Sequence, residues 1–488
     1  MYGLVNSQRL IYVTAISLSV MISLFITLSI DVINPDGVCY LLSAETMEDG
    51  LRQATKVCDQ AGWPLYAWLI AKTVSITHLS DIHAAFLLNT LLSTCSVWFF
   101  ILIVQTLSKP GQQIKLLWLA TVVILLAKGF NDSRQYIVKD HGYWACSLLA
   151  LLCCLYFIKT KKWYYAFAWA SASIVAMLFR VEGVFFLVGI PFLVWFDKTR
   201  SSAERTYAFF QLSAINIIGL IGILIFLGFF PPEKLGRLQE ISWERMQHFS
   251  QLFQSRAQML GQVLLSEYAQ GDRGIVLALT LVAWYVVYIV TSVSIIYAIL
   301  IMYAWYQKCL QHLDRERLVL WAYIIINVGV TFFFLLENMF LSKRYLVALT
   351  LVLLLWVPFA LLYLLNHKPR WIIFTVFLIM ALFGIKSIGS FGYSKAYIRE
   401  AGEWLHQHVP ANAMLYSNDI LVMYYSQHYG KNIYIQQKAF IQNPILIEKA
   451  EFIALRVNKK NQEGILFNMT PIVTFSNKRG DQVNIYQR

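Results

Sequence analysis

The sequence predicts an α-helical polytopic membrane protein with a small α/β domain at its carboxyl end, and three observations support that prediction. Hydrophobic residues make up 58% of the 488 residues and charged residues only 14%, whereas roughly a quarter of the residues in a soluble domain are charged. The apolar residues form uninterrupted runs that are long enough to cross a bilayer. The end of the chain is polar and contains short β-rich runs. These features exclude a water-soluble globular protein.

The first apolar run covers residues 11–30, which at about twenty residues is enough to span a hydrocarbon core. A cleaved signal sequence has a shorter apolar core, so we interpret this run as an uncleaved anchor. Further runs of spanning length, or nearly so, are 82–107, 116–129, 143–158, 163–179, 184–196, 207–230, 274–306, 318–340, 345–366 and 371–390. Together they predict about eleven transmembrane helices in a domain that covers residues 1–390.

The basic residues indicate how the chain is oriented. A net charge of +13 in a soluble chain could indicate a nucleic-acid partner, but here the Lys and Arg residues gather in short loops between apolar runs, and we expect no nucleic acid. These loops are 1–10, 108–115, 159–162, 197–206, 307–317 and 367–370. The positive-inside rule predicts a multi-pass protein of the inner (plasma) membrane with a cytoplasmic N-terminus and an extracytoplasmic C-terminus. The outer loops are then 31–81, 130–142 and 231–273.

Three segments need separate interpretation. Residues 63–80 are apolar but interrupted by Lys72 and His78, which favours an amphipathic helix along the outer interface. Residues 274–306 are long for one helix and could form a tilted or a broken span. The outer loop 231–273 contains apolar residues at helical spacing, which predicts a second interfacial helix. Those residues are Trp243, Met246, Phe249 and Phe253.

Residues 391–488 are expected to form a separate extracytoplasmic α/β domain. Ile398, Ala401 and Leu405 recur at helical spacing and predict a helix. Ser417–Asp419 could cap a second helix. Short β-rich runs follow at 432–436, 452–457, 472–475 and 483–486. The chain shows no internal repeat, which disfavours a transporter built from inverted halves.

Charged residues beside spans on the outer face are the candidate functional residues, because an ionisable group at the membrane boundary costs free energy unless it is paired or functional. The first candidates follow the opening span. Asp36 lies in the turn-prone sequence PDG, and Tyr40 begins a helical pattern. The alternative is a solvated loop in which Asp36 caps a helix.

A second group of charges lies in FNDSRQYIVKDHGYW, directly before the span 143–158. It contains Arg134, Lys139, Asp140 and His141. A carboxylate among cations can orient an acceptor or hold an anionic substrate. An interfacial belt with Asp140 at a helix N-terminus, favoured by the helix dipole, is an equally acceptable interpretation.

Two further groups lie later in the chain. Arg180 and Glu182 stand between two apolar runs with almost no loop and could pair with each other as a structural clamp. Lys343 and Arg344, followed by Tyr345, form a basic doublet on the outer side, where the orientation rule disfavours it. Guanidinium and ammonium groups bind phosphate by charge-assisted hydrogen bonds, so a lipid-linked phosphate is a suitable partner. Ordinary phospholipid headgroups would satisfy the same doublet.

The order of these segments resembles the integral-membrane glycosyltransferases of the GT-C fold. The segments are PDGVCY, GWPLYAWL, SRQYIVKDH, FRVEG and KRYL, and they extend to about residue 366. The closest pattern is that of enzymes with a lipid-phosphate-sugar donor, such as bacterial aminoarabinose transferase and protein O-mannosyltransferases. Trp63 stands where that pattern commonly has His or Pro. Gly37 follows Asp36, which argues against a metal-binding acidic pair.

The resemblance implies an inverting membrane glycosyltransferase that transfers a hexosyl or pentosyl group. The donor would be a polyprenyl-phosphate sugar, and the acceptor an envelope lipid such as lipopolysaccharide, a glycan or a protein on the extracytoplasmic face. Asp36 and Asp140 are then the expected catalytic residues. The expected substrate-binding residues are Tyr40, Arg134, Lys139, His141, Arg180, Glu182, Lys343, Arg344 and Tyr345. We further expect the acidic groups of the two loops to meet at one membrane edge, opposite the basic doublet.

Cofactors and rival functions follow from the same residues. Fixed cations could replace a metal at a monophosphate donor, so we expect no cofactor, although Asp36 and Asp140 together could hold one divalent ion. Membrane lipids are the remaining expected partners. The alternative functions are a transporter or flippase of lipid-linked sugars and a glycan polymerase or ligase with a pyrophosphate-linked donor.

The cysteines divide into two groups. Cys39 and Cys58 share the first outer loop and could form a disulfide in an oxidising compartment, but the sequence alone leaves their state open. The cysteines within spans are expected to be packing residues.

Overall fold

The computed structural model describes residues 2–198, 200–229, 243–389, 392–459 and 470–488. The chain forms two compact units, which we describe separately. Unit 1 contains Met1–Ile22, Thr90–Ser133 and Lys139–Ile388. Unit 2 contains Ser23–Asn89, Arg134–Val138 and Gly389–Arg488. Residues from three separate parts of the sequence therefore form each unit.

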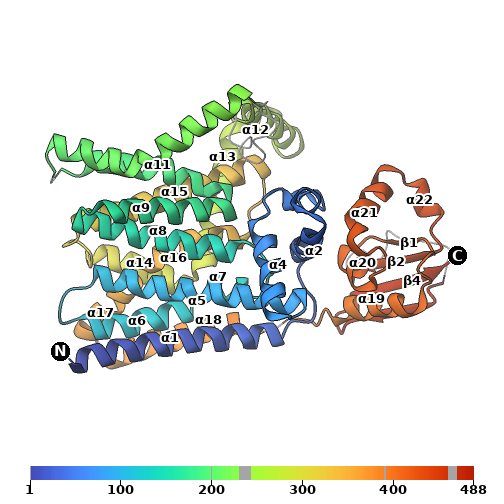
Figure 1. The fold of residues 1–488 in the computed structure, drawn as a ribbon, viewed down its shortest axis with the longest axis horizontal. Helices are drawn as coiled ribbons and strands as arrows, with labels where there is room; N and C mark the ends of the chain where they lie inside the picture. The colour runs from blue at the N-terminus through green and yellow to red at the C-terminus, as the bar shows by residue number, and fades with distance from the viewer. Residues whose placement is uncertain (1, 199, 230–242, 390–391, 460–469) are drawn as a thin grey trace. The chain divides into compact units, whose positions relative to one another are not determined.

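Unit 1 is built from helices, most of which run side by side in Figure 1. Two of them, α1 (Tyr2–Leu28) and α5 (Asp81–Leu107), have residues in both units. The others are α6 (Gln113–Leu125), α7 (Lys128–Ser133), α8 (Asp140–Thr160), α9 (Trp163–Phe179), α10 (Val184–Phe192), α11 (Ser202–Phe229), α12 (Trp243–Leu264), α13 (Arg273–Val293), α14 (Ile295–Tyr306), α15 (Asp314–Asn338), α16 (Val347–Leu354), α17 (Val357–His367) and α18 (Arg370–Ile388).

The helices confirm a membrane protein but not the number of spans. Among the described residues, six helices are long and apolar enough to cross a membrane, and the pair α16 and α17, bent by 42°, could supply a seventh span. Several of the remaining predicted spans, including α6 and α9, are shorter apolar helices. The run 274–306 is broken at Ser294, where a φ of +75° interrupts the helix between α13 and α14. The predicted total of eleven spans is therefore unconfirmed.

The helical hairpin of α8 and α9 places the charged residues of unit 1. Lys161 ends α8 in the left-handed conformation, so α9 runs back along α8. Small buried residues on α9, among them Ala170 and Ala176, allow the two helices to approach closely. A Cβ atom on Gly142 would lie only 2.3 Å from the Phe179 ring. This close packing places the end of α9 beside the start of α8.

Unit 2 begins with short helices in the first loop. They are α2 (Pro35–Glu45), α3 (Leu51–Ala54) and α4 (Leu65–Thr77), with single 3-10 turns at Thr46–Asp49 and Asp59–Gly62. Pro35 occupies the first turn of α2, where its fixed φ and missing N–H are tolerated. Cys39 and Cys58 form a disulfide, which decides the question that the sequence left open. The helix expected over 63–80 is present as α4.

The C-terminal part of unit 2 is a mixed four-stranded sheet with helices around it (Figure 1). Its strands are β1 (Leu415–Ser417), β2 (Phe452–Val457), β3 (Val473–Ser476) and β4 (Gln482–Gln487), in the order β1-β2-β4-β3. β1 pairs with β2 in parallel, and the other pairs are antiparallel. Its helices are α19 (Ala396–His408), α20 (Ile420–Ser426), α21 (Ile433–Gln442) and α22 (Ile445–Glu448).

Most predictions for this part are confirmed. Ile398, Ala401 and Leu405 are buried on α19, and the side chain of Asp419 caps α20 by accepting a hydrogen bond from the Leu421 amide at 2.8 Å. The strand predicted at 432–436 is wrong, because residue 432 ends a 3-10 turn and residues 433–436 begin α21. Ile433 and Phe440 are its buried residues, and their seven-residue spacing is that of one helical face.

A helix, α12, is present in the loop 231–273, as predicted; its place at the membrane interface stays a prediction. The side chains of Trp243 and Met246 lie outside the described residues. The Phe249 ring packs at 5.4 Å from the Phe333 ring on α15 and at 6.3 Å from the Phe253 ring on α12 itself. Within unit 1, this helix therefore packs by aromatic contact on one of the spans.

Candidate active site

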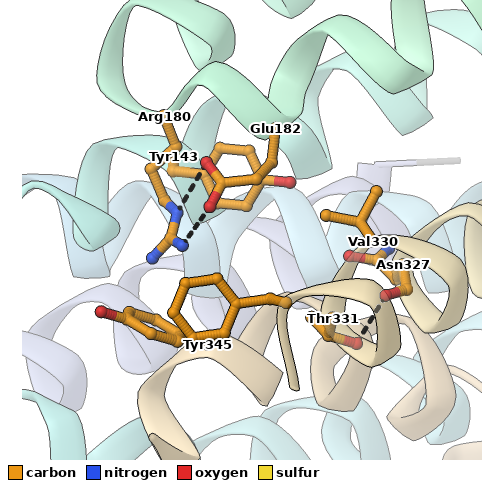
Figure 2. Close-up of a pocket in the computed structure, with 8 residues that line it drawn as sticks. Tyr143, Arg180, Glu182, Asn327, Val330, Thr331 and Tyr345 are labelled. Atoms are coloured by element: carbon orange, nitrogen blue, oxygen red, sulfur yellow. Dashed lines mark hydrogen bonds and ion pairs between the residues drawn. The ribbon is translucent and has the colours of Figure 1, made fainter. Parts of the chain in front are cut away.

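Unit 1 contains a small pocket that is partly open at its surface. Side chains from α8, α15, the turn between α9 and α10, and the 3-10 turn at Lys343–Leu346 line it (Figure 2). The lining residues are Tyr143, Arg180, Glu182, Asn327, Val330, Thr331, Phe334 and Tyr345. Three residues that the sequence singled out, Arg180, Glu182 and Tyr345, are thus brought together.

Arg180 is the centre of a buried ion cluster. It directly follows the last residue of α9 and has extended backbone. Its guanidinium donates hydrogen bonds to the carboxylates of Asp140 and Glu182, with 3.3 Å between Arg180 Nε and Glu182 Oε2. The side chains of Arg180 and Asp140 are only 11% and 5% exposed. Because buried charges are tolerated only when they are paired, this cluster fixes the guanidinium at the cavity wall.

Aromatic rings complete the surroundings of the cations. The guanidinium carbon of Arg180 lies 4.4 Å from the ring centre of Tyr345 and 5.7 Å from that of Tyr143. Arg344 approaches the same Tyr345 ring at 5.2 Å. The edge of Phe334 packs on Tyr345, with 4.9 Å between ring centres. Tyr345 therefore contacts both guanidinium groups, each in cation–π geometry.

The opposite wall of the cavity comes from α15. Asn327 and Thr331 lie one helical turn apart, and both are buried. The Thr331 hydroxyl lies 2.6 Å from the Asn327 carbonyl oxygen and 2.6 Å from the Tyr285 hydroxyl. Asn327, Thr331 and Tyr143 are lining residues that were not predicted from the sequence. Two polar residues four positions apart in an otherwise apolar span are the signal that could have identified the first two.

Three other residues predicted for the site, His141, Lys139 and Lys343, lie in unit 1 but outside the lining of this cavity. His141 is fully buried, with 2.9 Å between its Nδ1 atom and the Ser93 hydroxyl, and its ring packs edge-on against Trp144. Lys139 is half-buried at the N-terminus of α8. Lys343, from the basic doublet, is exposed. None of the three is among the described residues that line the cavity.

Asp36 and Tyr40 lie on α2 in unit 2. The Gln60 side-chain amide donates a hydrogen bond to Asp36 Oδ1 at 2.9 Å. Tyr40 is buried, and its ring packs edge-on against Tyr66 at 5.1 Å. Asp36 is therefore held at the first turn of a helix whose remaining residues are mostly buried.

The C-terminal part of unit 2 contacts this loop. The Tyr425 hydroxyl accepts a hydrogen bond from the Ile33 amide at 3.0 Å, and Lys431 pairs with Asp49 at 3.0 Å. The Tyr434 hydroxyl is 3.5 Å from the Pro35 carbonyl oxygen. Burial, and then the charge of Asp36, raise the pKa of Tyr434, so this hydroxyl keeps its proton.

Arg134 also belongs to unit 2. The residue is 3% exposed, and its guanidinium donates a hydrogen bond to the Ser23 hydroxyl at 2.5 Å. Burial lowers the pKa of Arg134 to about 9. The expected second acidic loop is thus divided: Arg134 lies in unit 2, whereas Lys139, Asp140 and His141 lie in unit 1.

The described residues contain no group of three or more His, Cys, Asp and Glu side chains that could hold a metal ion. Asp140 forms an ion pair with Arg180, and Asp36 accepts a hydrogen bond from the Gln60 side-chain amide.

Comparison with known proteins adds evidence from folds. No protein-family model matches the chain, and a search of curated proteins finds no match. Solved structures do resemble it over most of its length, among them the following. ArnT from Cupriavidus metallidurans, in the apo state, has a TM-score of 0.55 at 12% identity, covering 99% of this chain and 98% of ArnT. The oligosaccharyltransferase of Archaeoglobus fulgidus, in complex with Zn and sulfate, has a TM-score of 0.53 at 12% identity. The match covers 91% of this chain and 68% of the oligosaccharyltransferase.

The chain has the GT-C fold. The oligosaccharyltransferase AglB from Archaeoglobus fulgidus, in complex with an inhibitory peptide and a dolichol-phosphate, has a TM-score of 0.55 at 11% identity, and the match covers 91% of this chain and 69% of AglB. The likeness to ArnT extends over both units of the chain, whereas the sequence motifs stop near residue 366. The resemblance that the sequence suggested is thereby confirmed at the level of the GT-C fold.

Proposed function

We propose that this protein is an inverting membrane glycosyltransferase that moves a hexosyl or pentosyl group from a polyprenyl-phosphate donor to an envelope lipid, glycan or protein. The observation that carries the proposal is the GT-C fold, shared with ArnT over nearly the full length of both chains. The archaeal oligosaccharyltransferase of the same fold is known in complex with a dolichol-phosphate and a peptide, which supports a lipid-linked donor.

The basic residues of unit 1 are our candidates for the donor phosphate. Arg344 lies beside the cavity-lining Tyr345, and Lys343 is exposed next to it. Arg180 reaches the cavity wall but is already bonded to two carboxylates. We therefore assign phosphate binding mainly to Arg344 and Lys343. Arg180 would contribute a fixed positive charge at the cavity wall. Charge-assisted bonds of this kind stabilise the phosphate that departs.

Asp36 is our candidate for the general base. In the proposed step, its carboxylate takes the proton of the acceptor hydroxyl while the acceptor oxygen attacks the anomeric carbon. The bond between that carbon and the phosphate oxygen breaks on the opposite side, and polyprenyl phosphate leaves as the anion. Asp140 and Glu182 would act by holding Arg180. The step needs no cofactor.

The proposed topology follows the loop charges. The N-terminus is cytoplasmic, the loops 31–81, 130–142 and 231–273 are extracytoplasmic, and residues 391–488 form an extracytoplasmic domain. The contacts of Tyr425 and Lys431 with the first loop support a common side for that loop and the C-terminal part of unit 2. Cysteine accessibility labelling in intact cells tests this topology.

The function is tested with purified protein in proteoliposomes that contain envelope lipid and a series of radiolabelled polyprenyl-phosphate hexoses and pentoses. We expect one donor to release polyprenyl phosphate with transfer of label, undiminished by EDTA. Asp36→Asn should reduce transfer by about a thousandfold or more, since it removes the base. Asp49→Asn, which changes an exposed carboxylate of the same loop, is the matched control.

Transfer that persists in Asp36→Asn would remove the assignment of the base. Movement of intact donor across the vesicle membrane, without release of polyprenyl phosphate, would favour a flippase instead. Release that requires a pyrophosphate-linked donor would favour a polymerase or ligase.

A further inference from the structure

The hydrogen bond between Gln60 and Asp36 joins two parts of the first loop that are 24 residues apart. Asp36 lies in the first turn of α2, and Gln60 lies in the single 3-10 turn Asp59–Gly62. The Gln60 amide nitrogen is 2.9 Å from Asp36 Oδ1. An amide donor at this distance fixes one carboxylate oxygen and so orients the other.

A disulfide lies immediately beside this hydrogen bond. Cys39 is three residues after Asp36 on α2, and Cys58 is two residues before Gln60. One covalent link therefore joins the neighbours of both hydrogen-bonding residues. The intervening chain contains only short helices and turns, and the 3-10 turn that carries Gln60 has no side-chain cap. The disulfide is thus well placed to keep Gln60 on Asp36.

The helix that carries Asp36 has a separate anchor. Asn34, directly before α2, accepts a hydrogen bond from the Ile137 amide at 2.8 Å and donates one to the Ile137 carbonyl at 3.3 Å. A Cβ atom on Gly37 would lie 3.1 Å from the Ile137 Cβ, so this end of α2 packs closely on the segment 134–138. Loss of the disulfide should therefore release Gln60 while Asp36 keeps its place.

We propose that Gln60 is a positioning residue for the Asp36 carboxylate and that the Cys39–Cys58 disulfide holds Gln60 in place, so that reduction of the disulfide lowers turnover. The proposal rests on the proposed function, in which Asp36 is the base. It makes full activity dependent on an oxidising compartment, which agrees with an extracytoplasmic first loop.

The test compares three proteins with the wild type: Gln60→Ala, the double variant Cys39→Ala with Cys58→Ala, and the control Gln53→Ala. Gln53 is an exposed glutamine inside the loop that the disulfide closes. The first readout is the rate at which a carbodiimide and an amine label Asp36, followed by mass spectrometry. Labelling should rise severalfold in Gln60→Ala, in the double cysteine variant and in the reduced wild type, and should stay unchanged in Gln53→Ala.

The second readout is transfer from the polyprenyl-phosphate sugar that the wild type uses. Gln60→Ala should lower kcat about tenfold and leave KM for the donor unchanged, because the lost contact orients a catalytic group rather than the donor. The double cysteine variant should likewise show a lowered kcat and an unchanged KM for the donor. Combining the two changes should add little further loss, since both act through one hydrogen bond.

The outcomes separate this proposal from the proposed function. Unchanged labelling of Asp36 in Gln60→Ala and in the reduced protein would overturn the positioning role. A double cysteine variant that melts at a lower temperature but keeps its kcat would overturn the role of the disulfide. If labelling of Asp36 rises in Gln60→Ala and in the reduced protein but the wild type transfers no sugar from any donor, the proposed function is overturned and the positioning of Asp36 by Gln60 stands.

Discussion

Two carboxylate sites of this protein differ in the partner that holds them. In unit 1, Asp140 and Glu182 bond to the guanidinium of Arg180 in a cluster with little solvent exposure. In unit 2, Asp36 accepts a hydrogen bond from the neutral amide of Gln60. The disulfide between Cys39 and Cys58 links the segment that carries Asp36 to the segment that carries Gln60. The first site is organised by charge, and the second by covalent structure and a neutral donor.

The difference indicates which site suits which task. A buried carboxylate bonded to a guanidinium depends on that partner, because removing one member of a buried ion pair leaves an uncompensated charge. The cluster around Arg180 is therefore suited to hold a cation in place, whereas the hydrogen bond from Gln60 orients the Asp36 carboxylate without adding a charge. Four changes test this comparison.

The largest effect on stability is expected from removal of the Arg180 guanidinium in unit 1. Arg180→Leu leaves Asp140 and Glu182 without their guanidinium partner, which should cost about 3 to 5 kcal/mol in the free energy of unfolding. Denaturant unfolding in detergent, followed by tryptophan fluorescence, measures this loss. Arg399→Leu removes an exposed helical ion pair with Glu403 and should change the stability by less than about 1 kcal/mol. Equal effects of the two changes would show that the cluster is not organised by charge.

The second-largest effect on stability is expected from the packing of α8 against α9, the helices at whose ends the ion cluster lies. Gly142→Ala would put a Cβ atom 2.3 Å from the Phe179 ring and should push α9 away from α8, at a cost of about 1 to 3 kcal/mol. The same unfolding measurement applies. Gly329→Ala on α15 meets nothing within 4 Å and should be neutral or slightly stabilising, because alanine favours a helix. A neutral Gly142→Ala would contradict the close packing of α8 and α9.

A smaller effect is expected at the aromatic ring between the two arginines. Tyr345→Leu removes the ring that contacts Arg180 and Arg344 and should weaken binding of polyprenyl phosphate about fivefold, which corresponds to roughly 1 kcal/mol. Tyr345→Phe keeps the ring and should bind within about twofold of the wild type. Binding is measured by tryptophan fluorescence titration. If Phe and Leu weaken binding equally, the hydroxyl rather than the ring is important.

The smallest effect should be found in unit 2. Lys431→Ala removes an ion pair with Asp49 in which both side chains are partly exposed, so the stability should fall by less than about 1 kcal/mol. The loss should shrink further in high salt, which screens exposed charges. Thermal unfolding at two salt concentrations checks both statements. A loss as large as that of Arg180→Leu would mean that surface charge holds unit 2 together.

Elements with strong local patterns were predictable from the sequence. The run 163–179 has the same bounds as α9, and the run 452–457 has those of β2. The cap at Asp419 was also correct, because capping is a contact between residues close in sequence. The prediction at 432–436 failed, because a short run of apolar and polar residues fits a strand as well as the first turns of a helix.

The site was predictable only as a set of residue types. The sequence indicated Asp36, Asp140, Arg180 and Arg344, since charges beside apolar runs are conspicuous. It did not indicate that Arg180 bonds to Asp140, because these residues meet only when α9 returns along α8. Nor did it single out Gln60, a polar residue in a polar loop.

The sequence by itself determined a membrane protein with a mixed C-terminal domain, because hydrophobicity and periodicity are properties of neighbouring residues. Only the tertiary structure decided which charges pair, which carboxylate receives a neutral donor and that Cys39 and Cys58 are joined. Those pairings depend on distances between atoms that are far apart along the chain. The packing of helices sets such distances, and a linear pattern does not contain them.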